Sequence, residues 1–357
     1  MPRIDDRLEK ARFWILCFFI LALMAVPAFA GANRWTPFGP PMEEGTYDFR
    51  IDPYDPTHWI LQSSCFLESR DGGKTVVPFA SAVPRETWAI EFDPFVRYRL
   101  WAASDLEAPD GLFVSRNGGS DWQPVGATAP YSSYGRSLLV SAPRTLLLAT
   151  RGIYRSTDNG YSWKRVQAGF RGDANSYYVE YFFTGFARDP HSSSTVYALG
   201  SFSNPVQLGF GLIYRSDNGG RTWREWYVTR QLYEPGAVGF DPWRPHATYV
   251  TDEGKLRVTT DGGASFRTVS DIGMYTYTLL FDRAHQGTIY AAGQGLMRSR
   301  DGGLTWKDVS SGLPSDALVT TLVQDPVQSQ TFYAVADSVL YSARFTDGPA
   351  ASADRDP

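Results

Sequence analysis

The sequence predicts an all-β fold, a single seven-bladed β-propeller whose blades have four strands each. Three observations predict it. An eight-residue turn occurs six times, its copies follow one another at intervals of 40 to 60 residues, and an Asp-Pro pair ends the first predicted strand of most units. A period in the forties with several short strands per unit is typical of a propeller blade.

The repeated turn reads Ser/Thr-x-Asp/Asn-x-Gly-x-Ser/Thr/Asp and then an aromatic residue, except that Val76 closes the first copy. The copies span residues 69–76, 115–122, 156–163, 216–223, 259–266 and 299–306. Glycine at the fifth position can adopt the positive φ that a tight turn needs. The third position should accept hydrogen bonds from turn amides, which makes it structural. Its occupants are Asp71, Asn117, Asp158, Asn218, Asp261 and Asp301.

The count of first strands predicts how the ring closes. Seven units have a first strand, but only six carry the repeated turn, and the last unit lacks an outer strand. Residues 34–38 resemble that missing strand, with Trp35 in the position of Trp306. We therefore expect the N-terminal strand to pair with the last blade, which removes the exposed edge of the ring.

The chain is expected to have three parts. Residues 1–30 hold a charged start, an apolar run over 13–26 and a small-residue site ending at Ala30, a pattern that predicts a cleaved signal peptide. The alternative is an uncleaved membrane anchor that faces the protein out of the cytoplasm. Residues 31–345 form the propeller and 346–357 a disordered tail. The protein is therefore predicted to be exported, to the periplasm or the medium.

Composition and residue spacing argue against several function classes. The formal net charge is −4 and no basic run occurs, so nucleic acid is not an expected partner. All four histidines follow the first strand of a unit, where we expect solvated structural residues. No spacing resembles a metal site, and the glycine-rich stretches belong to the repeated turns. No metal or cofactor is therefore predicted, and the oligomeric state stays open.

One face of the propeller should carry the function. Connections between blades, and between the second and third strands of a blade, meet on the face opposite the repeated turns; we call it the long-loop face. The fourth unit has two insertions there, 167–184 and 200–211. Loops longer than a fold requires are often functional. The predicted ligand-binding residues are Tyr131, Tyr134, Arg136, Tyr177, Tyr178, Glu180, Tyr181, Tyr233, Glu234 and Tyr275.

Two interpretations of these residues stay open. Aromatic rings beside charged groups suit glycans, but the same rings could simply pack the long loops onto the rim. Hydrolysis of a glycan needs two carboxyl groups at a set separation. Ten acids are expected on this face: Asp105, Glu107, Asp110, Asp173, Glu180, Glu234, Asp252, Glu253, Asp271 and Asp316. The candidates for a catalytic pair are Asp105, Asp173, Glu180, Asp252 and Asp271, and no pair among them is singled out.

The repeated turns resemble the Asp-box of the BNR/Asp-box superfamily over roughly residues 33–345. That superfamily includes sialidases, xyloglucanase-type glycoside hydrolases, sortilin-type receptors and photosystem II assembly-factor propellers. The resemblance implies the fold much more than an activity. The Asp-Pro element at 52–56 looks most like the xyloglucanase and sortilin types. Those hydrolases work between two propellers, whereas this chain has one ring.

The leading hypothesis is an exported propeller that binds a glycan or an extracytoplasmic protein through its long-loop face, without catalysis. The first alternative is a glycoside hydrolase, xyloglucanase-like or sialidase-like, that uses paired carboxylates. The second is an assembly or stability factor for a membrane protein complex.

Overall fold

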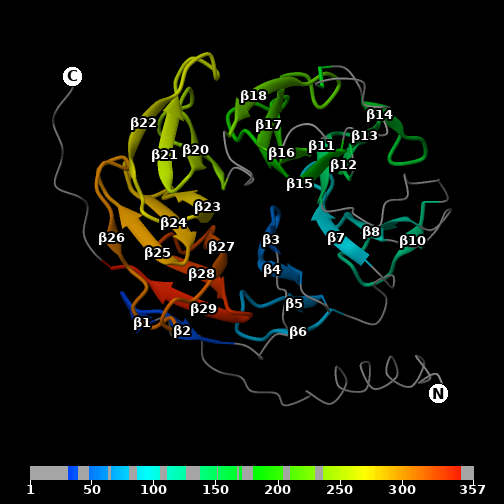
Figure 1. The fold of residues 1–357 in the computed structure, drawn as a ribbon. Helices are drawn as coiled ribbons and strands as arrows, with labels where there is room; N and C mark the ends of the chain where they lie inside the picture. Colours follow the sequence, from blue (N-terminus) through cyan, green and yellow to red (C-terminus); the bar gives the residue numbers. More distant parts are fainter. Residues whose placement is uncertain are drawn as a thin grey trace, which may run out of the picture.

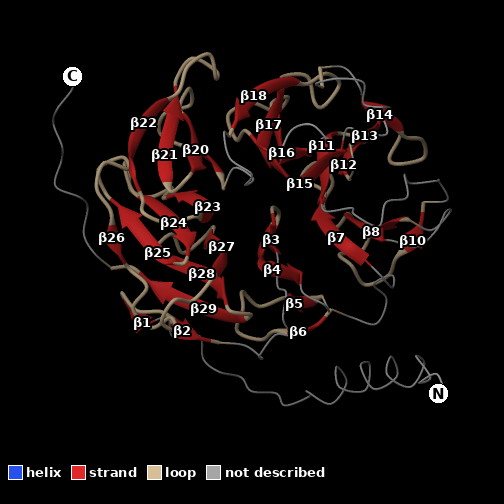
Figure 2. Ribbon diagram, in the orientation of Figure 1, coloured by secondary structure: helices blue, strands red, loops and turns tan. Residues whose placement is uncertain are grey.

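The chain forms a closed ring of β-sheets in the computed structural model (Figure 1). The structure describes residues 31–38, 48–62, 66–79, 87–104, 111–125, 137–150, 152–166, 169–170, 180–203, 210–229 and 236–346. Strands, turns and loops make up these residues, and no helix occurs among them (Figure 2). The predicted leader, 1–30, and the tail from 347 lie outside the described residues.

Each of the first six blades is one antiparallel four-stranded sheet whose strands follow in chain order. Blades one to three comprise β3 Asp48–Asp52, β4 Asp55–Gln62, β5 Leu67–Ser69, β6 Val77–Pro78, β7 Thr87–Phe92, β8 Leu100–Ser104, β9 Leu112–Ser115, β10 Gln123–Pro124, β11 Ser137–Ala142, β12 Thr145–Ala149, β13 Ile153–Ser156 and β14 Lys164–Val166. Blades four to six comprise β15 Glu180–Arg188, β16 Val196–Ser203, β17 Phe210–Ser216, β18 Arg224–Val228, β19 Val238–Phe240, β20 Thr248–Asp252, β21 Lys255–Thr259, β22 Arg267–Asp271, β23 Thr276–Phe281, β24 Ile289–Gly293, β25 Gly295–Ser299 and β26 Lys307–Asp308.

The seventh blade joins both ends of the described chain. It holds β27 Val319–Gln324, β28 Thr331–Ala336 and β29 Val339–Arg344, and receives β1 Gly31–Ala32 and β2 Thr36–Pro37 from the N-terminal side. Strand β2 pairs antiparallel with β29, while β1 pairs parallel with its last residues. The predicted fold class, a seven-bladed propeller closed by the N-terminal strand, is confirmed.

Trp35 fastens this closure. Its side chain is 1% exposed, and its Nε1 donates a hydrogen bond of 3.0 Å to the carbonyl oxygen of Val309, just after β26. Trp306 makes the corresponding contact one blade earlier, because its Nε1 donates to Ser270 Oγ on β22 at 2.9 Å. Both tryptophans thus reach back to the outer strand of the preceding blade, as the sequence alignment of the two predicts.

The core consists of layers between neighbouring blades. Second strands such as β12 and β28 are buried at every residue, because each lies between two blades. Their continuous apolar runs are what a strand buried on both faces requires. The outer strands β6, β10 and β26 are two exposed residues each. The middle strands therefore supply most of the buried core, whereas turns and loops form the two faces of the ring.

The repeated turns carry the predicted hydrogen bonds, and we call the face that holds them the repeat-turn face. In the turn 299–306, Asp301 Oδ1 accepts from the Thr305 amide at 2.9 Å, and the Gly303 amide donates to Ser299 Oγ at 2.8 Å. Gly303 has φ +91°, a value that only glycine adopts readily. Asn218 replaces the aspartate without loss, since its Oδ1 accepts from the Thr222 amide at 2.9 Å.

These contacts shift the titration of the turn aspartates. Hydrogen bonds from Ser265, and then from Thr259, lower the pKa of Asp261. For Asp71, Asp158 and Asp301 burial is the largest single effect and raises the pKa, but the combined hydrogen bonds of the turn outweigh it and the net shift is downward. All four carboxylates therefore stabilise the fold in their charged form.

The Asp-Pro pairs form a second structural turn on the same face. The Asp241 carboxylate accepts a hydrogen bond of 2.8 Å from the amide of Trp243, two residues on. Asp282, which is followed by Arg283 instead of proline, accepts the same bond from Ala284 at 2.8 Å. The aspartate rather than the proline thus defines this turn.

One expectation about the histidines is wrong. His191 and His246 are exposed, but His58 is only 4% exposed. His58 Nδ1 lies 3.5 Å from Asp52, and its Nε2 lies 3.6 Å from Glu68. The reason is that β4 begins directly after the Asp-Pro turn, so residue 58 occupies the position of Arg99 in the next blade and points back at the aspartate of its own turn, as Arg99 does.

Candidate functional site

A polar depression of about 400 Å³ lies on the long-loop face where blades four and five meet. It is lined by Tyr227, Val228, Asp252, Glu253 and Arg257. Strand β18 supplies the first two residues at its end, β20 ends at Asp252, and Arg257 stands on β21. The depression thus spans a seam between two blades.

Asp252 is the centre of the hydrogen bonding in this depression. Its Oδ2 accepts a hydrogen bond of 2.7 Å from the Tyr227 hydroxyl and lies 3.7 Å from Arg257 Nε. Arg257 Nη1 donates to Thr268 Oγ1 at 3.2 Å. Arg257 Nε is buried and has no hydrogen-bond partner among the described residues. A guanidinium next to a carboxylate at an open depression is suited to a polar ligand.

Tyr227 stays a hydrogen-bond donor at all physiological pH values. Burial, and then its hydrogen bond to Asp252, raises the pKa of Tyr227 above the usual 10.0. The phenol therefore remains protonated and holds the carboxylate of Asp252 in one orientation. Asp252 is thus held between a phenol and a guanidinium, and its Oδ2 accepts the hydrogen bond of the phenol.

A tight hairpin places a second carboxylate at the rim. The turn between β20 and β21 has two residues, Glu253 with φ +52° and Gly254 with φ +74°. Positive φ at both positions matches the turn type that two-residue hairpins prefer. Glu253 is exposed at the tip, so its carboxylate is available to a partner.

Two exposed tyrosines lie farther along the same face. Tyr275 and Tyr277 are 37% and 45% exposed, and their ring centroids are 5.0 Å apart at an interplanar angle of 68°. Tyr277 occupies the irregular position between Thr276 and Thr278 where the pairing of β23 with β24 shifts by one residue. Such a bulge redirects a side chain, which here leaves the ring exposed instead of packed.

The sequence-predicted residues have different fates. Nine of them fall outside the described residues, and their roles stay predictions: Tyr131, Tyr134, Arg136, Tyr177, Tyr178, Tyr233, Glu234, Asp105 and Asp173. Glu180 opens β15, where it pairs with Ser203. Asp252 lines the depression, and Tyr275 lies on the surface. Asp271 is exposed, with its Oδ1 accepting from the Gly273 amide at 2.8 Å.

Tyr181 lies in the core and not on the surface. It is 2% exposed and packs against Phe170, Phe183 and Phe202, with ring centroids 5.1 to 5.8 Å away. The predicted insertion 167–184 includes the first five residues of β15, which pair with a long β16. Part of the extra sequence therefore lengthens the sheet, and its rings become core.

Sequence reasoning missed Tyr227 and Arg257. Neither stands in a long loop, because both belong to ordinary blade strands next to the seam. The repeat pattern could have located both residues, because it shows which strand positions lie at the seam between two blades. Alternation along β21 turns Arg257 away from the buried residues Leu256 and Val258, while β18 brings Tyr227 to the same seam from the neighbouring blade.

Neither metal ligation nor membrane spanning has support in the described residues. No group of three or more His, Cys, Asp or Glu side chains is placed to hold a metal ion in the described ranges. Within those same ranges, no helix is long and apolar enough to cross a membrane.

Solved structures of low sequence identity share this fold. YCF48 from Cyanidioschyzon merolae is similar with a TM-score of 0.61 at 20% identity, over 87% of this chain and 98% of its own. YCF48 bound to D1 peptide gives a TM-score of 0.60 at 18% identity, over 89% and 100% of the two chains. No protein-family model and no curated protein sequence matches this chain.

A hydrolase of about twice the length shares the fold as well. The GH74 xyloglucanase from Xanthomonas campestris gives a TM-score of 0.63 at 17% identity, and the likeness covers 89% of this chain but 54% of the hydrolase. The extracellular domain of BT4673 from B. thetaiotaomicron gives 0.58 at 13% identity, over 89% of this chain and 44% of that one. The seven-bladed fold and these neighbours agree with the resemblance that the repeated turns indicate.

Proposed function

We propose that the protein is an exported β-propeller that binds an extracytoplasmic protein or a glycan through its long-loop face and performs no chemistry there. The observation that carries this proposal is the fixed carboxylate of Asp252. Its Oδ2 accepts from Tyr227 and lies beside Arg257, so it is arranged as a recognition group. Glu253 and Arg257 add one charge of each sign at the same depression.

A protein partner has the stronger support. The likeness to YCF48 covers nearly the whole of both chains, and one of those structures holds a D1 peptide. A depression with two carboxylates, a phenol and a guanidinium can bind a peptide through its backbone polar groups and basic side chains. A glycan is supported by Tyr275 and Tyr277, because exposed aromatic rings can stack on sugars.

The binding test uses the tagged full-length protein, purified from detergent-solubilised cells that produce it naturally, with co-purifying proteins and glycans identified by mass spectrometry. Asp252→Asn and Arg257→Gln should reduce partner recovery about tenfold or more, since each breaks a charge-assisted contact. Arg221→Gln is the matched control, because Arg221 is exposed in a repeated turn on the opposite face. Equal recovery with all three variants would refute the proposal. Recovery of one membrane protein complex would support a role in its assembly.

The alternative, a glycoside hydrolase using Asp252 with a second acid, is supported by the shared fold of the xyloglucanase. Reducing-end release from xyloglucan, β-glucans, pectins and sialylated glycans tests it. We expect no release above a boiled control. Release that disappears in the Asp252→Asn variant would replace binding with hydrolysis.

A further inference from the structure

Large apolar side chains stand at the tips of the turns on the repeat-turn face. They come from six of the seven blades, and each is at least 40% exposed. Five of them follow the aspartate of an Asp-Pro turn, and two hold the sixth position of a repeated turn. The first group is Tyr54, Val96, Tyr98, Trp243 and Val327, and the second is Tyr161 and Leu304.

Tyr98 holds its exposed position at a conformational cost. It has φ +63°, and Gly287 has φ +76° at the corresponding place in blade six. In both turns the carbonyl oxygen of that residue accepts a hydrogen bond from the repeated turn of the same blade, from the Gly118 amide at 2.8 Å and from the Gly302 amide at 2.9 Å. Positive φ is unfavourable for a bulky residue but not for glycine. Because Tyr98 is 52% exposed, packing within the chain does not offset that cost.

The exposed charges of this face are mostly basic, although the formal net charge of the chain is −4. Among the described residues of the Asp-Pro turns and repeated turns, eight exposed side chains are basic and three are acidic. The basic ones are Arg70, Lys74, Arg97, Arg116, Arg144, Arg221, Arg244 and Arg283, and the acidic ones are Asp121, Asp217 and Asp261. The guanidinium carbon of Arg97 lies 4.9 Å from the ring centroid of Tyr98, so a cation and an exposed ring share one turn.

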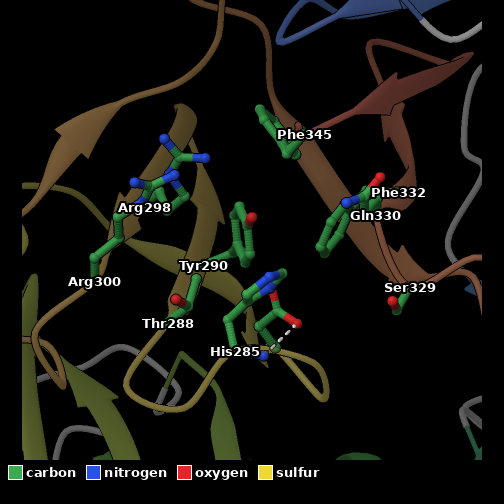
Figure 3. Close-up of a pocket in the computed structure, with 10 residues that line it drawn as sticks. His285, Thr288, Tyr290, Arg298, Arg300, Ser329, Gln330, Phe332 and Phe345 are labelled. Carbon is green, nitrogen blue, oxygen red and sulfur yellow. Dashed lines mark hydrogen bonds and ion pairs between the residues drawn. The ribbon is translucent and has the colours of Figure 1, made fainter. Parts of the chain in front are cut away.

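Both ends of the described chain lie at the repeat-turn face. Strand β29 runs towards this face, and the amide of Phe345 after it donates to the carbonyl oxygen of Gln330, in the Asp-Pro turn of blade seven, at 2.9 Å. Figure 3 shows Phe345 and Gln330 at the seam between blades six and seven. From the N-terminal side, Asn33 Oδ1 accepts a hydrogen bond of 3.2 Å from the Thr346 amide. The apolar run 13–26 therefore precedes a strand that enters the ring at this face.

The link between the apolar run and the propeller is short. Five peptide units separate Val26 from Gly31, which opens β1, and they span at most about 18 Å when fully extended. Whenever the apolar run lies in a membrane, either during export or as the anchor that the sequence allows, this edge of blade seven is within that distance of the lipid. The turn tips of the same face then stand next to the membrane surface.

We propose that the repeat-turn face rests on the surface of a phospholipid membrane, with its apolar tips at the boundary between headgroups and acyl chains and its exposed arginines beside the phosphates. A protein partner would require one contiguous apolar patch, whereas a planar membrane meets the turn tips of six blades at once. Tyrosine, tryptophan and arginine each join an apolar body to a polar end, which suits this boundary.

The proposed orientation leaves the opposite face free. The depression at Asp252 then points away from the membrane and stays open to the partner proposed above. Vesicles of pure lipid contain no such partner, so the membrane inference can be tested separately from the proposed function.

Photolabelling from the lipid tests the orientation. The full-length protein is mixed with vesicles of phosphatidylcholine and phosphatidylglycerol that carry a phospholipid with a diazirine near its headgroup. After irradiation, mass spectrometry locates the labelled residues. We expect labels in the turns 156–163 and 299–306 and at Trp243 and Val327, in addition to residues 1–30. Labels confined to residues 1–30, or equally strong labels at Tyr275, would overturn the proposal.

Vesicle co-sedimentation measures what the apolar tips contribute. The background is the full chain with Leu16→Asp and Leu21→Asp, because two charges in the apolar run prevent it from spanning the bilayer. A variant of three turn tips should bind the vesicles about tenfold or more weakly, since three apolar side chains no longer leave water. It carries Tyr161→Ser, Leu304→Ser and Val327→Ser.

The matched control changes three apolar residues of the long-loop face that are 37 to 45% exposed. It carries Tyr275→Ser, Tyr277→Ser and Leu318→Ser, and it should bind the vesicles as the background does. Circular dichroism of each protein checks that the fold is kept. Equal vesicle binding by the two triple variants would overturn the proposal.

The charge of the lipid tests the arginines. Arg97→Gln together with Arg144→Gln should weaken binding to the phosphatidylglycerol mixture about tenfold, because each cation near an anionic surface adds to the attraction. Binding to pure phosphatidylcholine, which carries no net charge, should not change. An equal loss on both lipids would refute contacts between these arginines and anionic headgroups.

Discussion

The two faces of the ring use aspartate in opposite ways. On the repeat-turn face, Asp301 binds the amide and hydroxyl of Thr305 four residues away, within a single turn. On the long-loop face, Asp252 binds Tyr227, which is 25 residues away and belongs to the neighbouring blade. Acids that satisfy nearby backbone amides stabilise the fold. An acid held by side chains across a seam, beside an open depression, is available to a partner.

Disrupting the closure of the ring should lower the free energy of unfolding more than any other change, because both faces depend on a closed ring. Trp35→Ala removes a ring that is 1% exposed together with its hydrogen bond to Val309. We expect the free energy of unfolding to fall by about 3–5 kcal/mol. Urea denaturation followed by circular dichroism measures it. Tyr161→Ala is the control, because Tyr161 is 61% exposed and should cost at most about 0.5 kcal/mol. Equal losses would mean that Trp35 does not fasten the ring.

The repeat-turn face should lose less when one carboxylate is removed. Asp301→Ala deletes acceptors for the Thr305 amide and hydroxyl and for Ser299. We expect a loss of about 1–2 kcal/mol in the same denaturation experiment. Asp301→Asn should keep most of the stability, because Asn117 and Asn218 occupy this position in two other turns. A larger loss for asparagine than for alanine would contradict a structural role.

Acid should weaken the repeat-turn face in particular. The turn aspartates have folded-state pKa values below their usual 3.8, so their contribution is complete above that pH. It is lost as the pH falls through the lowered pKa values. A variant with all four turn aspartates changed to asparagine should therefore approach the wild type in stability between pH 4 and 2. Urea denaturation at pH 6, 4 and 3 measures the free energy of unfolding of both proteins. If the difference between wild type and variant grew as the pH fell, the turn aspartates would not have lowered pKa values.

The long-loop face should tolerate change best. Tyr227→Phe removes one hydrogen bond to Asp252, and we expect a cost of about 1 kcal/mol or less in stability. Partner recovery should fall clearly in the same variant, because the carboxylate loses its fixed orientation. Thermal melting and co-purification, measured side by side, separate the two effects. A large loss of stability with unchanged recovery would assign Tyr227 to the fold alone.

The sequence predicts the repeat-turn face far better than the long-loop face. Turn residues such as Gly303 and Asp301 interact within eight residues, so their spacing alone reveals the structure. The match between Trp35 and Trp306 likewise rests on a local pattern that repeats. The sequence predicts a surface position for Tyr181, because its place in an insertion does not reveal that β15 extends into that insertion. The pairing of Tyr227 with Asp252 depends on which strand residues meet across a seam, and no single repeat unit records that.

Site-specific crosslinking compares the two faces most directly. A photo-crosslinking amino acid replaces Glu253 at the rim of the depression in one full-length protein, and Leu304 in another. Leu304 is 62% exposed in the repeated turn 299–306, on the opposite face. Both proteins are irradiated in the cells that produce them, and crosslinked products are identified by mass spectrometry. A discrete partner captured from position 253 and not from position 304 is the result we expect. Capture from position 304 alone, or the same products from both positions, would contradict a binding role for the long-loop face.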